Sequence, residues 1–211
     1  MEVNKFFQEN GYLYIPNLII DPESMKCDPP LDQNGNRMLG LLEFRHNKYN
    51  LIQDEQVDGA FARYNFPIFK EAHEIIRLAL EMHLGINLHP SYYYDRFYYV
   101  NQELKKHTDR PACEISVSIQ VSSNSKNPWE FWFDTPNGVK SISMKNGDGV
   151  AYKGMDIPHW RKPLKSRHSK LTKFFNYMRK RIDDTYHHQI FFHYVNAQGN
   201  YVHHAYDRIE K

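Results

Sequence analysis

The sequence predicts a mainly β protein (α+β), a jelly roll with N-terminal helices packed outside it. Three observations predict this fold. From Ser91 onward Tyr, Phe, Val, Ile and Trp dominate, the apolar period becomes two, and Asn, Gly and Pro turns separate the segments. With 211 residues the chain can bury one sizeable core, so we expect a single domain over residues 1–211. We expect residues 1–90 to form a helical support region and residues 91–196 the jelly-roll core.

The N-terminal region contains two helical patterns. Apolar side chains recur at helical spacing before Gly11, which can end the first helix in a left-handed conformation ahead of an extended segment. A second helix is predicted with Pro67 in its first turn and Gly85 just past its end. Its apolar face is expected to consist of Ile68, Ala72, Ile75, Ile76, Ala79 and Leu80. Residues 21–50 are rich in Pro, Asp, Asn and Gly, which favours a long loop.

The alternating pattern is clearest in residues 115–122, where Ile and Val alternate with Ser and Gln. This alternation is typical of a strand that is buried on one side only. Further strands are expected at residues 92–100, 129–134, 139–144, 149–153 and 188–195. Turn sequences such as Pro-Asn-Gly separate them, as in an antiparallel barrel.

Composition and charge narrow the classes of partner. The net charge is only +2, so any contact with nucleic acid has to come from a local patch. Cys27 and Cys113 are too few for a disulfide framework and lie in no zinc-finger spacing, which fits the reducing cytosol. We see neither a secretory signal pattern nor a segment apolar for long enough to span a bilayer. We therefore expect a cytoplasmic protein with no membrane partner.

The tripeptide His107-Thr108-Asp109 and the distant His159 carry the pattern of a metal site. Side chains at positions i and i+2 of a strand share a face, so His107 and Asp109 can point together into the mouth of a barrel. A histidine from a later strand can then complete three ligands on one side of a metal ion. Two imidazoles and one carboxylate are the facial triad that holds Fe(II) with positions left open.

Zinc is the alternative metal, because two histidines and one carboxylate also form hydrolytic zinc sites. The HExxH helix of the zinc hydrolases does not occur in this sequence, however. A His-x-Asp tripeptide is weak evidence by itself in a chain with 12 histidines, so the interpretation depends on the neighbouring segments.

Those segments resemble the Fe(II)- and 2-oxoglutarate-dependent oxygenases, specifically the prolyl-4-hydroxylase-like branch, over approximately residues 92–195. The segment from Tyr98 to Asp109 is similar to the family's Tyr-x-x-Gly block before His-x-Asp, with Asn101 in place of the glycine. The segment PWEFWF is similar to a Gly-Gly-x-Thr-x-Phe strand that lacks its glycines, and GDGVAY resembles the turn and strand before the distal histidine. The resemblance implies a double-stranded β-helix.

The resemblance also implies roles for single residues. His107, Asp109 and His159 would bind Fe(II), and Tyr98 would donate a hydrogen bond to the far carboxylate of 2-oxoglutarate. The family's basic anchor for that carboxylate lies about ten residues after the distal histidine, where this chain has Ser169. A buried carboxylate still requires a cation, so we expect Arg161 to take this role. The other candidates for a basic contact are Arg96, Arg167 and Lys173.

The implied reaction consumes 2-oxoglutarate and O2, releases succinate and carbon dioxide, and hydroxylates the substrate. A peptide or small-molecule substrate is expected. Demethylation through an unstable hydroxylated product is the variant that an AlkB-like nucleic-acid demethylase would carry out. A non-catalytic jelly-roll binding protein is the alternative outside the enzymes.

A basic insertion, residues 161–181, separates the distal histidine from the last strand. It contains no acid and interleaves basic residues with Phe174, Phe175 and Tyr177. Cations and aromatic rings together suit a phosphate-bearing or single-stranded partner, so nucleic acid is a possible partner here. A loop that covers the substrate mouth is the other interpretation.

The remaining histidines and the tryptophans have simpler interpretations. We expect His187, His188 and His193 to be exposed or to lie at the edge of the core, without a second metal. The tryptophans are expected to pack the barrel; they are Trp129, Trp132 and Trp160.

Overall fold

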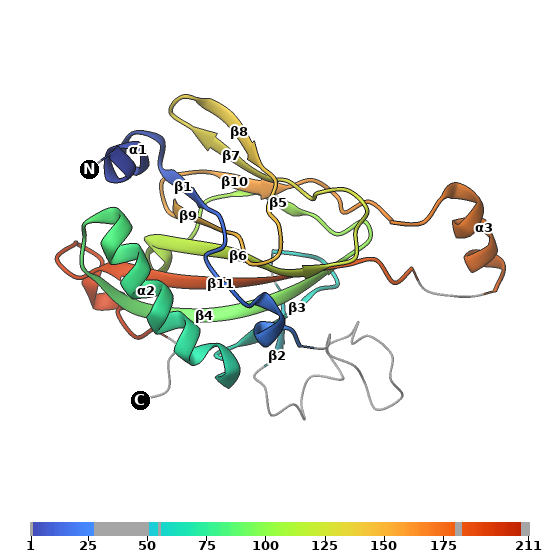
Figure 1. Ribbon diagram of the computed structural model, residues 1–211, viewed down its shortest axis with the longest axis horizontal. Helices are drawn as coiled ribbons and strands as arrows, with labels where there is room; N and C mark the ends of the chain where they lie inside the picture. Colours follow the sequence, from blue (N-terminus) through green and yellow to red (C-terminus); the bar gives the residue numbers. More distant parts are fainter. Residues whose placement is uncertain (1, 28–50, 55, 180–182, 208–211) are drawn as a thin grey trace.

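Two antiparallel sheets face each other and form the body of the protein (Figure 1). The computed structural model describes residues 2–27, 51–54, 56–179 and 183–207. The larger sheet has the strand order β1-β9-β6-β11-β4-β3-β2, and the smaller sheet has the order β5-β10-β7-β8. This arrangement confirms the predicted jelly roll.

The larger sheet consists of β1 (Tyr12–Ile15), β2 (Leu51–Gln53), β3 (Phe61–Tyr64), β4 (Leu88–Tyr99), β6 (Ile115–Ser123), β9 (Gly149–Lys153) and β11 (Tyr186–Asn196). The smaller sheet consists of β5 (Leu104–His107), β7 (Phe131–Thr135), β8 (Gly138–Ile142) and β10 (His159–Arg161). The α-helices are α1 (Glu2–Asn10), α2 (Lys70–Leu84) and α3 (Lys170–Met178). Short 3-10 helices span Pro22–Met25, Pro67–Phe69, Pro111–Cys113 and Val202–His204.

The two N-terminal helices pack on the outer face of the larger sheet, as predicted (Figure 1). Gly11 and Gly85 follow α1 and α2 with φ angles of 74° and 65°, the left-handed conformation expected at helix ends. The predicted apolar face of α2 was partly wrong. Ile68 and Ile75 are exposed, and His73, Ile76, Leu80 and Leu84 are the side chains that the helix buries.

The region before residue 90 is not only helical. Strands β1, β2 and β3 extend the larger sheet at both edges, whereas only the extended segment after Gly11 was predicted. Most of the predicted loop at 21–50 lies outside the described residues. No helix in the described part of the chain is both long and apolar enough to cross a bilayer.

The interior between the sheets is polar along one strand. Ile115, Val117 and their partners on β6 pack toward the helices, and the alternate serines and Gln120 point between the sheets. These polar side chains are buried, so the prediction that this face of β6 is exposed was wrong. The barrel therefore offers hydrogen-bonding groups next to its candidate site.

The basic insertion contains a helix rather than only a loop. After β10 the chain leaves the body, forms α3 at one end of the molecule and returns to β11 (Figure 1). None of the side chains of α3 is buried. Ser169 caps the helix by accepting a hydrogen bond from the backbone N–H of Thr172.

His73 on α2 makes stability dependent on pH. Burial lowers the pKa of His73 to about 4, and its Nε2–H donates to the carbonyl of His193. The unfolded chain, with an ordinary histidine pKa near 6.5, takes up this proton first as the pH falls. The free energy of unfolding should therefore decrease from pH 6.5 to pH 4, by about 3 kcal/mol from this residue.

The variant His73→Gln keeps an N–H donor and cannot take up a proton in this range. In urea unfolding at pH 7, 6 and 5, its free energy of unfolding should fall less steeply than that of the wild type. The difference in slope should approach ~1.4 kcal/mol per pH unit. Identical slopes would show that folding does not lower the pKa of His73.

Candidate metal centre

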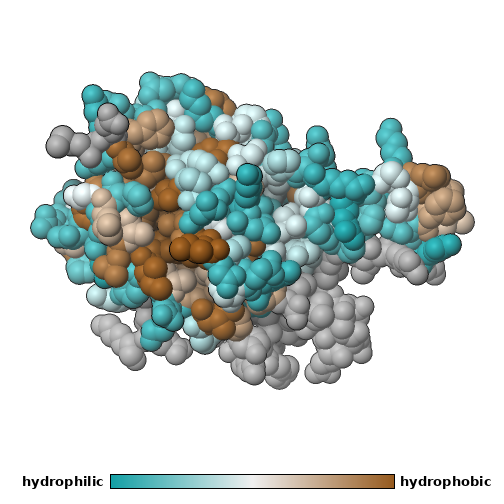
Figure 2. Space-filling view, viewed as in Figure 1, coloured by the Kyte–Doolittle hydropathy of each residue, from teal (hydrophilic) through white to brown (hydrophobic). Residues whose placement is uncertain are grey.

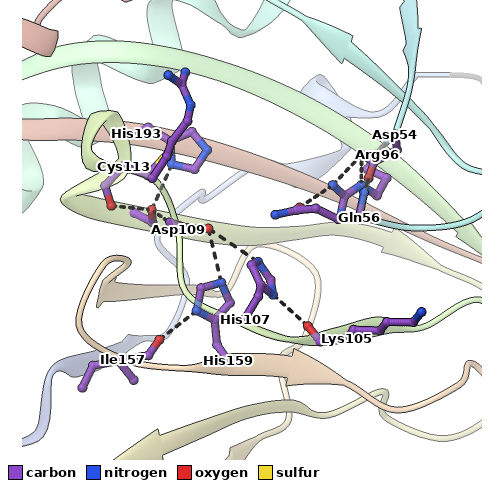
Figure 3. A network of polar contacts seen from close by, with 12 residues as sticks. Asp54, Gln56, Arg96, Lys105, His107, Asp109, Cys113, Ile157, His159 and His193 are labelled. Carbon is purple, nitrogen blue, oxygen red and sulfur yellow. Dashed lines mark hydrogen bonds and ion pairs between the residues drawn. The ribbon is translucent and has the colours of Figure 1, made fainter.

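Three side chains from separate positions in the chain converge between the sheets (Figure 3). His159 begins β10 and lies opposite His107, the last residue of β5. Asp109 Oδ1 is 3.5 Å from His107 Nε2 and 3.6 Å from His159 Nε2. Asp109 follows β5 instead of lying on it, so the predicted i, i+2 arrangement on one strand was wrong, although the convergence occurs.

Backbone carbonyls fix the orientation of both imidazoles. His107 Nδ1 lies 2.8 Å from the carbonyl oxygen of Lys105, and His159 Nδ1 lies 2.9 Å from that of Ile157. A carbonyl only accepts, so each Nδ1 carries the proton and each Nε2 presents its lone pair. Both lone pairs therefore point at the space beside Asp109, as metal ligands require.

Asp109 is held as a carboxylate. Burial alone raises its pKa, but the imidazoles of His107 and His159 beside Oδ1 outweigh that effect and lower the pKa well below its usual range. Its second oxygen accepts a hydrogen bond from Ser116 Oγ at 3.0 Å, and Ser116 Oγ lies 2.9 Å from His193 Nδ1. One carboxylate oxygen thus faces the histidines while the other is fixed by the chain (Figure 3).

Gly154 leaves room for the carboxylate of Asp109 because it has no side chain. The backbone N–H of Asp109 donates to the carbonyl of Gly154 at 2.8 Å. A Cβ at position 154 would lie 2.5 Å from Asp109 Oδ2 and even closer to the carbonyl oxygen of Cys113. Only glycine fits this close approach, and no sequence pattern indicates this role for Gly154.

Arg161 lies two residues after His159, in the interior of the barrel, and is only 1% exposed. Its guanidinium packs against Trp129 and Phe131, with its central carbon 4.7 Å from each ring centroid. Nη1 donates to the carbonyl of Trp129, but Nε and Nη2 have no hydrogen-bond partner among the described residues. Burial without an acidic partner lowers the pKa of Arg161 to about 10.

Arg96 and Tyr98 lie two residues apart on β4, and their side chains are joined by a hydrogen bond. Arg96 donates to Tyr98 Oη at 2.7 Å, to Asp54 Oδ2 at 2.6 Å and to Gln56 Oε1 at 3.0 Å. Its charge is therefore neutralised by Asp54 (Figure 3). Since Arg96 can only donate, Tyr98 Oη accepts this bond and keeps its own proton for another acceptor.

The other predicted anchors lie elsewhere. Arg167 pairs with Asp184 at the surface, and Lys173 projects from the exposed α3. The expectation that His187, His188 and His193 are exposed or lie at the edge of the core was wrong: they are 1%, 0% and 2% exposed. The spacing of His187 and His193 along β11 could have indicated that these two share a face, but not that this face is the inner one.

The fold is that of the 2-oxoglutarate- and Fe(II)-dependent oxygenases. The structure matches an oxidoreductase of the 2OG-Fe(II) oxygenase family from Burkholderia pseudomallei with a TM-score of 0.62 and 10% identity, covering 98% of this chain and 93% of the other. It matches HygX from Streptomyces hygroscopicus, solved with nickel and 2-oxoglutarate, with a TM-score of 0.61 and 10% identity, covering 93% of this chain and 87% of HygX. A Trichoplax adhaerens prolyl hydroxylase in complex with a peptide fragment matches with a TM-score of 0.57 and 11% identity, covering 93% of this chain and 88% of the hydroxylase.

These likenesses agree with the predicted resemblance to the prolyl-hydroxylase-like branch. At about 10% identity they concern the architecture and not the activity. No protein-family model and no curated protein sequence matches the chain.

Proposed function

We propose that this protein is an Fe(II)- and 2-oxoglutarate-dependent dioxygenase that hydroxylates a peptide or a small molecule. His107, Asp109 and His159 would hold the metal. Arg161 and Tyr98 would bind the far carboxylate of 2-oxoglutarate. The observation that carries the proposal is the buried Arg161, two residues along the strand from a candidate metal ligand, whose Nε and Nη2 have no hydrogen-bond partner in the described part of the chain.

The donor set fits the metal. Two neutral imidazole nitrogens and one carboxylate oxygen, all within 4.8 Å of one another, leave further coordination positions open. His107 and Asp109 keep partly exposed side chains, 21% and 11%, so substrate and oxygen have a way in on their side. His159 is buried behind them.

The interior fits the cosubstrate. Two residues of a strand span about 7 Å, which matches the reach of a five-carbon dicarboxylate with one end at the metal ligands and the other at Arg161. Arg161 offers two unused N–H groups in the side-on arrangement that suits a carboxylate. Tyr98 adds a hydroxyl proton, and Arg96 acts indirectly, because it orients Tyr98 while bound to Asp54.

Bound iron and 2-oxoglutarate would supply oxidative chemistry with release of succinate and carbon dioxide. The chain contributes geometry and charge. The carbonyl-bound imidazoles keep their lone pairs on the metal side, Ser116 holds the carboxylate of Asp109, and the aromatic wall of Trp129 and Phe131 excludes water from the Arg161 contact.

Succinate formation tests the proposal. Protein supplied with Fe(II), ascorbate, 2-oxoglutarate and air should release succinate, and a true substrate among peptides, small acids, nucleosides and oligonucleotides should accelerate the release. Omission of Fe(II) should stop it. Absence of iron-dependent succinate with every compound would contradict the proposed activity and favour the non-catalytic binding protein.

A second candidate, an AlkB-like demethylase acting on nucleic acid, is favoured by the surface of α3. Phe174, Phe175 and Tyr177 are 58%, 50% and 80% exposed, with Lys170 and Lys173 beside them. Figure 2 shows this mixed hydrophobic and hydrophilic surface at the projecting end of the molecule. Exposed rings and cations can bind bases and phosphates of a single strand.

The double variant Lys170→Glu/Lys173→Glu tests this surface. If α3 binds nucleic acid, affinity for a single-stranded oligonucleotide should fall at least tenfold, and the dependence of binding on salt should weaken. The matched control Lys5→Glu/Lys26→Glu changes charge on the N-terminal side of the chain and should leave binding unchanged. Equal affinities for both double variants would exclude α3 as the contact surface.

A further inference from the structure

His187 is a second buried polar side chain at the Arg161 end of the barrel. It lies on β11 opposite Tyr98 on β4 and is 1% exposed. Its Nε2 has no hydrogen-bond partner within the described ranges. A buried polar atom that is left unpaired costs free energy, so a ligand that supplies the missing bond would remove that cost.

The surroundings place His187 next to the same space as Arg161. Its ring meets Trp129 edge to face with centroids 4.9 Å apart, and Trp129 also contacts the guanidinium of Arg161. Burial, and then the charge of Arg161, lowers the pKa of His187 well below its ordinary value. The imidazole is therefore neutral and has a single N–H, which it can donate from Nε2 in one tautomer.

A cavity opens at this point. It has a volume of about 260 Å³ and is lined by Trp129, His187, Met144 and Gln120, with Lys126 and Lys145 at its polar side. Both rings line this cavity, and Trp129 also packs on the guanidinium of Arg161. A ligand that extends from Arg161 toward the cavity would therefore meet these two rings.

We propose that His187 donates a hydrogen bond to the far carboxylate of the cosubstrate beside Arg161, and that its ring sets the length of the dicarboxylate that fits. This inference rests on the proposed function, because it concerns the same cosubstrate. His187 on the larger sheet would thus position the cosubstrate and select its length, in addition to Arg161 on the smaller sheet. A 2-oxo diacid one carbon longer than 2-oxoglutarate would collide with the imidazole.

Two variants separate the hydrogen bond from the steric role. His187→Ala removes the donor and opens the space toward the cavity, whereas His187→Phe removes the donor and keeps the space filled. Calorimetric titration of the nickel-loaded protein with 2-oxoglutarate and with 2-oxoadipate measures both effects without turnover. Lys126→Ala at the exposed side of the cavity is the matched control.

Both variants should bind 2-oxoglutarate about tenfold more weakly, the loss of roughly one hydrogen bond. Only His187→Ala should gain affinity for 2-oxoadipate relative to 2-oxoglutarate, by about tenfold or more. Suppose that the wild type binds 2-oxoglutarate tightly, and that His187→Ala has the same affinity for it and the same preference between the two diacids. This result would overturn the inference about His187 and leave the proposed function standing. Failure of the wild type to bind 2-oxoglutarate at all would overturn the proposed function with it.

Discussion

Replacing His107 with Ala is expected to abolish stable metal binding while leaving the fold intact. His107 is the more exposed of the two histidines among the three candidate ligands. Truncation of its side chain therefore opens no cavity in the core. Loss of residues that merely support metal ligands already costs roughly 10- to 100-fold in affinity, so loss of a ligand should cost at least 100-fold. Iron-dependent succinate formation should fall to background.

Metal content after dialysis, thermal unfolding and calorimetry with Ni(II) measure these effects. A matched control exists in the chain, because His168 with Asp183 and Asp184 forms another group at the surface that could hold an ion. His168→Ala should leave tight binding and succinate formation unchanged. A metal lost from His168→Ala and retained by His107→Ala would place the centre at the surface and contradict the account.

Replacing Arg161 with Met is expected to remove cosubstrate binding without destabilising the protein. Two charge-assisted hydrogen bonds to a carboxylate contribute about 3 to 4 kcal/mol together, which corresponds to a roughly 100- to 1000-fold loss of affinity. Methionine keeps an unbranched apolar side chain against Trp129 and Phe131 and takes an unpaired buried charge out of the barrel. The free energy of unfolding should therefore stay constant or rise.

Calorimetric titration of 2-oxoglutarate into nickel-loaded protein and urea unfolding of the metal-free protein measure the two effects. Arg167→Met is the matched control, because Arg167 pairs with Asp184 at the surface and should affect neither. Unchanged affinity in Arg161→Met combined with a large loss of stability would show that Arg161 is only structural.

The sequence was sufficient for the fold and for the three converging residues. Alternation along β6 and the aromatic and β-branched residues of β4 and β11 predicted these strands, and the His-x-Asp tripeptide with a distal histidine predicted the convergence. Arg161, expected as the carboxylate anchor, is buried like His159, which it follows by two residues on β10. Strands and short ligand motifs are local features of the sequence, so a period of two or a tripeptide is enough to predict them.

The partners of the inward-facing residues could not be predicted, because they depend on contacts between distant parts of the chain. Nothing near Arg96 in the sequence indicates that Asp54 neutralises it. This ion pair distinguishes Arg96 from Arg161, which has no acidic partner among the residues that the structure describes. The serine face of β6 looks solvent-exposed from its polarity, yet it lines the barrel. An alternating pattern usually means that the polar face of a strand is exposed to solvent, but in a barrel with a polar interior this face is buried. Such departures tend to occur at functional sites.

The visible absorption of the anaerobic complex is the most direct test of a metal held by His107, Asp109 and His159 with 2-oxoglutarate anchored at Arg161. Fe(II) and 2-oxoglutarate added together should produce a weak metal-to-ligand charge-transfer band in the wild type. His107→Ala should show no band, and Arg161→Met should need at least 100-fold more 2-oxoglutarate to develop it. A folded wild type without the band, or a band unchanged in His107→Ala, would contradict the account.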